Sequence, residues 1–227
     1  MRALPGHASR SAELTLPPNR EEAAAAQRGR ILRTASELFS KRGYNATSTE
    51  LIVRRARAGY ATFYKYFSDK EECMLALLEE AEARAVAAMS AAYERTEGDW
   101  PEKTGAALAS LFELIASERH LAKACLVESL NAGAEAQLRY RAAVKRLADL
   151  LRPGRRFVAD ADQLPAMVED TLAGGVLWIA YERLIVGDHE RLLTLIPEMV
   201  EFALTPFLGE ARAVAVAEGL GAATRAG

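Results

Sequence analysis

Apolar residues recur three or four positions apart along most of this chain, which is the spacing of one face of an α-helix. In the first and fourth predicted helices these positions are Ile31, Ala35, Leu38 and Phe39, and Met74, Leu77, Leu78, Ala81 and Ala85. No stretch alternates apolar and polar residues in the way that a half-buried strand does. The pattern therefore predicts an all-α fold.

Proline, glycine and helix-capping residues divide the chain into four predicted parts. Residues 1–19 contain several prolines and no helical period, so we predict a disordered arm there. Residues 20–68 contain three predicted helices, the last two joined by a very short turn, and this predicts a helix-turn-helix head. Residues 69–208 are predicted to form a larger helical body, and residues 209–227 a flexible tail.

The segment at residues 59–71, GYATFYKYFSDKE, carries the strongest functional signal. It places aromatic residues and lysines in one short predicted helix, residues 60–66, and in the turn that follows. Capping boxes at residues 47–50 (TSTE) and 68–71 (SDKE) open the helices before and after it. A short helix joined in this way to a long capped helix suits the DNA-reading end of a helix-turn-helix.

The charge of the chain is unevenly distributed. The whole chain has a formal net charge of −2, but residues 1–70 hold 13 basic and 6 acidic residues and residues 71–227 hold 16 and 25. The predicted head therefore carries +7 and the remainder −9. A basic segment on an acidic protein indicates a polyanionic partner at that end.

Other chemistry is poorly supported by the sequence. Cys73 and Cys125 lie in apolar helical stretches and are predicted to be buried thiols, and the histidines lack metal-ligand spacing. We find no nucleophile–base pair and no glycine-rich phosphate loop, so we predict no metal, no cofactor and no enzymatic activity. No apolar run is long enough to cross a bilayer and no secretion signal is visible, so we expect a cytoplasmic protein without a membrane partner.

In a helix-turn-helix the first turn of the second helix meets base edges in the major groove. The residues that fit this role are Gly59, Tyr60, Ala61, Thr62 and Lys65. Tyr64 and Tyr66 can bind phosphates through their hydroxyls, which positions the protein without reading sequence. Phe63 points the opposite way and is predicted to lie in the core.

Helix N-termini provide two further predicted anion sites, because their free N–H groups and dipole attract phosphate. Lys70 lies at the start of the long helix that follows the head. Thr47 and Ser48 lie at the start of the second helix of the head. We therefore add these three residues to the predicted DNA contacts.

This region resembles the TetR family of bacterial repressors. The matching segments are ILRTASELF at 31–39, RGYNATS at 42–48, TFYKYF at 62–67 and SDKE at 68–71. The match runs from about Arg28 to Leu78, under a quarter of the chain, and the rest is similar only in length, helical content and helix order. The resemblance places Thr62, Tyr64 and Tyr66, with Lys70, where the family contacts DNA, and residues 60 and 61 where sequence choice varies.

The resemblance implies a homodimer that binds a near-palindromic operator and is released from it by a small-molecule effector. Two positions depart from the family pattern. Arg57 stands where the family usually has glycine in the turn, and a left-handed arginine there costs about 1–2 kcal/mol. Gly59 stands where the family often has serine capping the next helix, and it provides no side-chain cap.

The effector site is expected between the long fourth helix and the four helices that follow. Candidate lining residues are Met89, Tyr93, Trp100, Phe112, Ile115, Leu126, Tyr140, Trp178 and Tyr181. Each of them could equally serve as core packing. Glu113, Glu128 and Glu182 could meet a cationic ligand if they point inward, or they could be solvated.

The last two long helices are the expected dimer interface, because each carries an apolar stripe. The candidate residues are Leu172, Val176, Ile179, Ile196, Met199, Val200, Ala203 and Phe207. Gly174 and Gly175 lie mid-helix, where glycine is unfavourable and indicates close approach of another helix. The stripes could also be intramolecular core.

Three functions remain open from the sequence. The first is a sequence-specific transcriptional regulator, expected to be a repressor under ligand control. The second is an architectural or ligand-independent DNA-binding protein of the same fold, in which the body would have a filled core instead of a cavity. The third, an all-α enzyme, lacks any recognisable catalytic group.

Overall fold

The computed structural model describes residues 20–226, so the predicted arm at residues 1–19 lies outside the described residues. The described chain is helical throughout, as the apolar spacing predicts. Its α-helices are α1 (Arg20–Arg42), α2 (Thr49–Arg55), α3 (Tyr60–Tyr66), α4 (Lys70–Arg95), α5 (Trp100–Ser117), α6 (Arg119–Leu126), α7 (Ala134–Leu151), α8 (Val168–Val186), α9 (Arg191–Leu208) and α10 (Glu210–Ala226). Three short 3-10 helices are η1 (Glu128–Asn131), η2 (Arg152–Phe157) and η3 (Ala161–Gln163).

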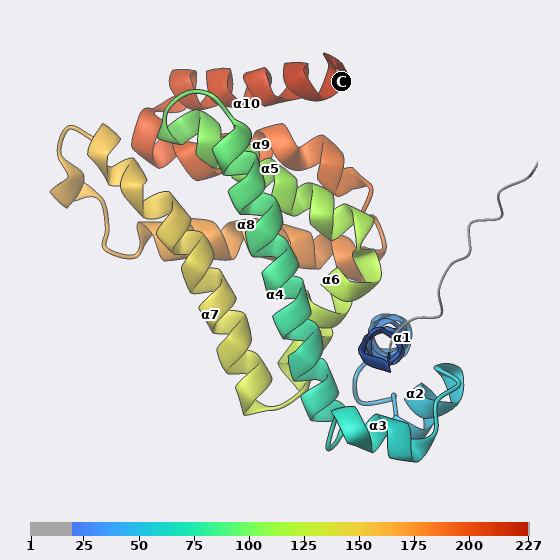
Figure 1. Cartoon of the computed structure of the whole chain (residues 1–227). Helices are drawn as coiled ribbons and strands as arrows, with labels where there is room; N and C mark the ends of the chain where they lie inside the picture. The colour runs from blue at the N-terminus through green and yellow to red at the C-terminus, as the bar shows by residue number, and fades with distance from the viewer. Residues whose placement is uncertain (1–19, 227) are drawn as a thin grey trace, which may run out of the picture.

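The head consists of α1, α2 and α3 at one end of the molecule (Figure 1). Its core is built on large side chains with at most 2 % exposure, namely Ile31, Phe39, Ile52, Phe63 and Phe67. The first two turns of α4 belong to the same core, through Cys73, Met74 and Leu77. The head is therefore packed onto the start of α4 rather than attached to it by a linker.

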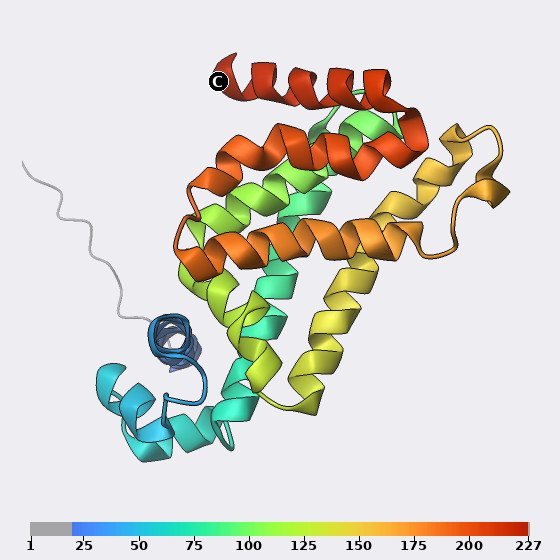
Figure 2. The same ribbon diagram turned by 180° about the vertical axis from the view of Figure 1, so that it is seen from behind.

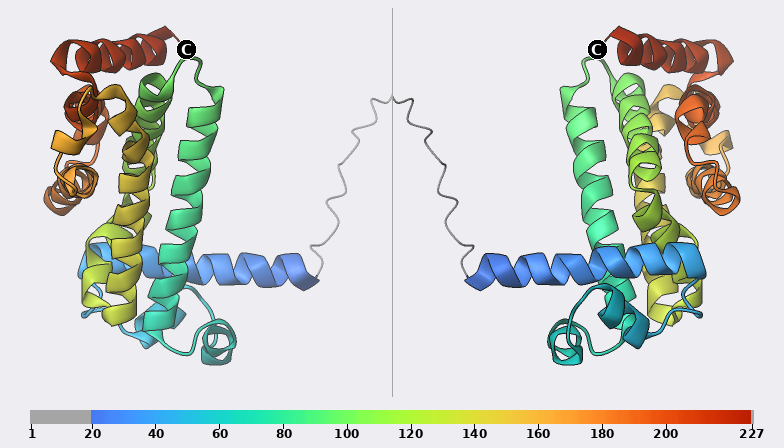
Figure 3. Two further views of the ribbon diagram at one scale, coloured as in Figure 1. Left: turned by 90° about the vertical axis from the view of Figure 1, so that its left-hand side faces the viewer. Right: turned by 90° about the vertical axis from the view of Figure 1, so that its right-hand side faces the viewer.

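The body packs helices in layers behind α4. The side views show α4 and α7 running upward from the level of the head, with α1 projecting sideways beneath them (Figure 3). From behind, α8, α9 and α10 lie one above another across the molecule (Figure 2). The α5 helix packs against α4, α9 and α10, and its buried residues, such as Leu108 and Phe112, form the centre of the body core.

The capping box predicted at the start of α4 is displaced by one residue. The N-cap is Asp69 rather than Ser68, and its carboxylate accepts a hydrogen bond from Glu72 N at 2.8 Å. Glu72 in turn accepts from Ser68 N at 2.6 Å, and this hydrogen bond lowers the pKa of the Glu72 carboxyl. Aspartate caps a helix as well as serine does, so the motif satisfies the same free N–H groups from the next position.

The structure corrects the predicted flexible tail. Residues 210–226 form α10, which packs along α9 and α5. Ala213, Val216 and Ala217 are buried in this contact. The approach is close, because a Cβ built on Gly105 of α5 would lie 3.0 Å from Leu220 and 3.2 Å from Val216. The buried face of α10 consists of small residues three or four positions apart. Such residues give a weak apolar pattern in the sequence, but they suit close helix packing.

No helix in the described part of the chain is both long and apolar enough to cross a membrane.

The burial of α10 leads to a stability prediction. Ala217→Asp places a carboxylate without a partner in a site that is 2 % exposed, and we expect a loss of about 3 kcal/mol or more in the free energy of unfolding. Ala215→Asp makes the same change on the exposed face of the same helix and should cost little. Denaturant unfolding of both variants measures the difference. Equal stabilities would mean that α10 does not contribute to the body core.

Candidate nucleic-acid interface and ligand cavity

The outer face of α3 presents two tyrosines to solvent. Tyr60 and Tyr64 are 50 % and 55 % exposed, and their rings stack with centroids 6.4 Å apart. Phe63, between them in sequence, is fully buried, as predicted. One face of this short helix therefore fixes it to the head core, and the opposite face offers two phenols to a partner.

The other predicted DNA contacts fall into exposed and buried groups. Ser48, Gly59, Ala61 and Lys65 are exposed, and Thr62 is half-buried. Ser48 is the N-cap of α2 and accepts from Leu51 N at 3.2 Å. The structure corrects the role of the Thr47 side chain, because it is 1 % exposed and its hydroxyl donates to Gly43 O at 2.8 Å.

Tyr66 and Lys70 are engaged within the protein. The Tyr66 hydroxyl donates to Ala24 O of α1 at 3.1 Å. The Lys70 ammonium donates to Tyr44 O at 2.9 Å and to Thr47 O at 3.1 Å, and it lies 4.1 Å from the centre of the Tyr44 ring. Partial burial lowers the pKa of Lys70. Lys70 therefore ties the α1–α2 loop to the start of α4, and its contact with DNA remains a prediction.

The head is also tied to α6 and η1 by residues that sequence reasoning missed for this role. The Glu128 carboxylate accepts from Tyr44 N at 2.8 Å, and Ser40 Oγ lies 3.1 Å from His120 Nδ1. Glu128 was a candidate for binding a cationic ligand, but it instead caps a backbone N–H at the end of α1. These contacts join residues about eighty positions apart, so no local sequence pattern could reveal them.

The turn between α2 and α3 keeps the left-handed residue that the resemblance implies. Arg57 has a φ of 50°, and Gly59 is the N-cap of α3 without a side-chain hydrogen bond. Both departures from the family pattern are therefore accommodated without a change in the turn.

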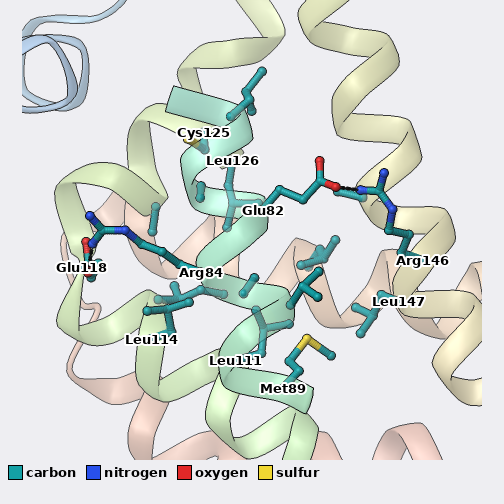
Figure 4. A pocket seen from close by; sticks show the side chains of 18 of the residues that line it. Glu82, Arg84, Met89, Leu111, Leu114, Glu118, Cys125, Leu126, Arg146 and Leu147 are labelled. Carbon is teal, nitrogen blue, oxygen red and sulfur yellow. Dashed lines mark hydrogen bonds and ion pairs between the residues drawn. The ribbon is translucent and has the colours of Figure 1, made fainter. Parts of the chain in front are cut away.

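The body contains a cavity of about 450 Å³ beside α4, which is partly open to solvent. Figure 4 shows Met89, Leu111, Leu114 and Leu147 directed into it from α4, α5 and α7. From α4 the wall is formed along the helix from Leu78 to Glu94, a rise of about 24 Å for sixteen residues. The cavity is therefore long and mostly lined by hydrocarbon.

Charged side chains lie at the margins of this cavity. Glu82 of α4 pairs with Arg146 of α7, and Arg84 of α4 pairs with Glu80 and Glu118 (Figure 4). Arg139 lies 3.6 Å from Glu135 through its Nε, which is buried and lacks a hydrogen-bond partner among the described residues. Ion pairs thus link α4 to its neighbours on both sides of the cavity. The Nε–H of Arg139 donates no hydrogen bond to the described residues.

The sequence located the cavity between the correct helices but only part of its lining. Among the candidates, Met89, Tyr93, Ile115, Leu126 and Tyr140 line it. Four others do not and are corrected here: Trp100 and Phe112 are core residues, whereas Trp178 and Tyr181 stack on each other outside the cavity. The Trp100 indole donates to Leu150 O at 3.2 Å and packs on Phe207, which directs it away from α4.

Most residues of the predicted dimer stripe are corrected as well. Six of the eight are buried within the single chain, namely Leu172, Val176, Met199, Val200, Ala203 and Phe207. Ile179 and Ile196 are half-buried. The exposed apolar face of α8 and α9 lies beside this stripe, where Trp178 is 60 % and Phe202 47 % exposed. The predicted stripe is the inner face, because α6 and α7 pack on α8, and α5 and α10 pack on α9.

Comparison with known proteins gives a consistent picture. Residues 31–77 match the family model described as bacterial regulatory proteins, tetR family. The chain is 35 % identical over 89 residues to the HTH-type transcriptional activator FasR of Mycolicibacterium smegmatis, a match covering 39 % of this chain and 40 % of that protein. The matched part is thus about two fifths of the relative's length.

Solved structures are similar over more of the chain. The fatty acid degradation regulator FadR from Bacillus halodurans has a TM-score of 0.67 and 19 % identity, covering 78 % of this chain and 97 % of that one. FadR from Bacillus subtilis in complex with stearoyl-CoA has a TM-score of 0.63 and 18 % identity, with coverage of 78 % and 97 %. At these identities the similarity establishes the fold.

The engagement of Lys70 leads to the second prediction. Lys70→Ala removes a charged donor from two backbone carbonyls, and we expect a loss of about 1.5–3 kcal/mol in the free energy of unfolding. Lys65→Ala, at an exposed lysine of α3 without a hydrogen bond to the backbone, should leave stability nearly unchanged. Thermal unfolding of the two variants is the measurement, and an unshifted Lys70→Ala transition would contradict the structural role.

Proposed function

We propose, from the match of residues 31–77 to the tetR family of bacterial regulatory proteins, that the protein is a transcriptional repressor that a small-molecule ligand releases from its operator. One observation carries this proposal. The continuous helix α4 connects a basic head with an exposed tyrosine pair to the wall of a large apolar cavity.

The exposed face of α3 supports major-groove binding. Tyr60 lies at the first position of α3 and Tyr64 one turn later, and the small residues Gly59 and Ala61 beside them allow close approach of the backbone to base edges. We therefore assign base contacts to Gly59–Thr62 with Lys65, and phosphate contacts to Tyr64 and the N-terminus of α2 at Ser48.

A second copy of the chain is the proposed partner of the α8–α9 face. Trp178, Ile185 and Phe202 expose large apolar surfaces there, and a Cβ on Gly174 would meet no atom within 4 Å of the same chain. One short α3 helix reads few bases, so two heads about 34–36 Å apart are needed to recognise an operator. The dimer that we propose uses this outer face in place of the inner stripe expected from the sequence.

The cavity favours ligand control over the ligand-independent alternative. A mostly apolar cavity of about 450 Å³ offers space for a small molecule, which an architectural protein does not need. The length of the wall along α4 suits an extended hydrocarbon chain. A similar fold binds stearoyl-CoA in the Bacillus subtilis protein, and we propose a long-chain acyl compound as the effector here.

Release would follow from a shift of α4. Occupancy of the cavity separates α4 from α7, where Glu82 and Arg146 pair, and from α6, where Arg84 and Glu118 pair. Because the first turns of α4 are part of the head core, any tilt of the helix carries the head with it. A ligand that binds better to one head spacing shifts the population toward that spacing.

The decisive experiment is DNA binding by the purified protein. Duplex from immediately upstream of its own gene is compared with random duplex of equal length over a salt series. A protected near-palindrome occupied by two subunits supports the proposal, and addition of stearoyl-CoA should then dissociate the complex whereas acetyl-CoA should not. Failure to bind either duplex at low salt would overturn the proposal.

The exposed tyrosines give the third prediction. Tyr60→Ala should change which operator bases are preferred, because it removes a contact at the base edges. Tyr64→Phe should weaken binding to all sequences alike, because it removes a phosphate contact only. Competition binding against operators mutated one base pair at a time separates the two effects, and an identical loss of affinity on every sequence for Tyr60→Ala would refute its base-reading role.

The cavity gives the fourth prediction. Ala85→Trp places an indole in the cavity from α4, so we expect a loss of acyl-ligand affinity of at least about tenfold. Ala83→Trp, on the exposed side of the same helix and outside the cavity lining, is the matched control. Isothermal titration with stearoyl-CoA measures both. Unchanged affinity in Ala85→Trp would place the ligand elsewhere.

A further inference from the structure

The turn between α2 and α3 forces an arginine into a conformation that favours glycine. Arg57 is the one non-glycine residue with positive φ in the described part of the chain. Ala58 N donates to Val53 O at 3.0 Å and Arg57 N to Arg54 O at 3.3 Å, which are the two hydrogen bonds of a Schellman motif with Arg57 at its left-handed position. Because these hydrogen bonds hold the turn in place, Arg57 adopts the left-handed backbone conformation despite its steric cost.

The surroundings of the turn hold its geometry in place. The Arg30 guanidinium donates from Nε to Ala56 O at 3.1 Å, which satisfies the last carbonyl of α2. Ala58 packs against the head core next to the buried Ala56. Relaxation of Arg57 to an ordinary conformation would break these contacts and move α3. A glycine would fit the same turn without strain.

The arginine instead contributes charge to an unusual cluster. Arg54, Arg55 and Arg57 are exposed and, with Leu51, line a surface pocket of about 370 Å³. Within residues 20–226, none of the three guanidinium groups forms an ion pair with a carboxylate or a hydrogen bond with a side chain. Because the three guanidinium groups lie within four residues, all three would attract an anion bound in this pocket.

The position of this pocket indicates which anion it binds. It lies at the end of α2, two residues before Gly59, the N-cap of α3, and thus beside the tyrosine pair assigned to the operator. We propose that Arg57, together with Arg54 and Arg55, binds a backbone phosphate next to the bases that α3 reads. This inference rests on the proposed DNA-binding function. A glycine at residue 57 would remove the strain but also the positive charge. The strained arginine therefore contributes to DNA affinity in a way that glycine cannot.

Three substitutions at residue 57 separate charge from strain. Arg57→Gly removes both, Arg57→Ala removes the charge and keeps the strain, and Arg57→Lys keeps both. Arg141→Ala is the matched control, because it removes one exposed arginine from α7 in the body and changes the net charge equally. Each full-length variant is measured for melting temperature and for operator affinity over a salt series.

The melting temperature of Arg57→Gly should equal that of the wild type or exceed it by about 2–4 °C. The melting temperature of Arg57→Ala should equal that of the wild type. Both should lose operator affinity by about tenfold at moderate salt. The slope of log affinity against log salt should flatten by about one for each subunit's lost contact. Arg57→Lys and Arg141→Ala should keep the wild-type slope.

Two results would overturn this inference while leaving the proposed function intact. The first is wild-type operator binding with an unchanged slope in Arg57→Gly and Arg57→Ala. The second is an equal flattening in Arg141→Ala, which would assign the effect to net charge alone. Absence of any duplex binding by the wild-type protein would instead overturn the proposed function on which the inference rests.

Discussion

The orientation of α3 depends on one hydrophobic junction, where Phe63 and Phe67 pack with the first turns of α4. Their ring centroids lie 5.5 Å apart, and they share a core with Cys73, Met74 and Leu77 of α4. Interiors of this density do not deform gradually, so α3 and the start of α4 move as one unit. Lys70 reinforces the junction by bonding two carbonyls of the α1–α2 loop.

The same junction reaches the cavity. Leu78 and Cys125 belong to the head core and also line the cavity. The head core and the cavity therefore share these two residues. The α6 helix packs against α1, and Glu128, just beyond it, accepts from Tyr44 N. A ligand that displaces α4 or α6 therefore acts on the head by two routes. The ion pairs of Glu82 and Arg84 resist such displacement until the ligand contacts replace them.

Local patterns predicted the head well because its structure is governed by short-range rules. The span of α3 and the burial of Phe63 follow from spacing within a few residues, whereas the left-handed residue at 57 is implied by the family resemblance. The α4 cap moved from Ser68 to Asp69 because both residues can cap and the sequence does not rank them. The all-α class follows equally directly, since helical spacing persists through the body.

The inner and outer faces of α8 could not be assigned in the same way. Its sequence is apolar on most sides, so periodicity does not identify the buried stripe. The buried face of α8 is chosen by its contacts with α6, α7 and α9, which the sequence of α8 does not reveal. The α10 helix, which packs on α9, is inconspicuous because its packing face is built from alanine and valine. Four of the aromatic cavity candidates, Trp100, Phe112, Trp178 and Tyr181, were wrong for a related reason, whereas Tyr93 and Tyr140 do line the cavity. Trp100 fills the far side of the body core, while leucines and a methionine shape the cavity.

The α8 helix brings the cavity and the proposed dimer face together. Leu177 lines the cavity, and Trp178, the next residue, is 60 % exposed on the outer face. Successive residues of a helix point about a quarter turn apart. The Leu177 side chain therefore faces the cavity and the Trp178 side chain faces solvent, although both belong to α8. A second subunit seated on Trp178 would hold α8 in place, and α4 would then be the wall that yields to a ligand. Because α4 carries the head, fixing α8 through the proposed dimer would convert filling of the cavity into a change of head spacing.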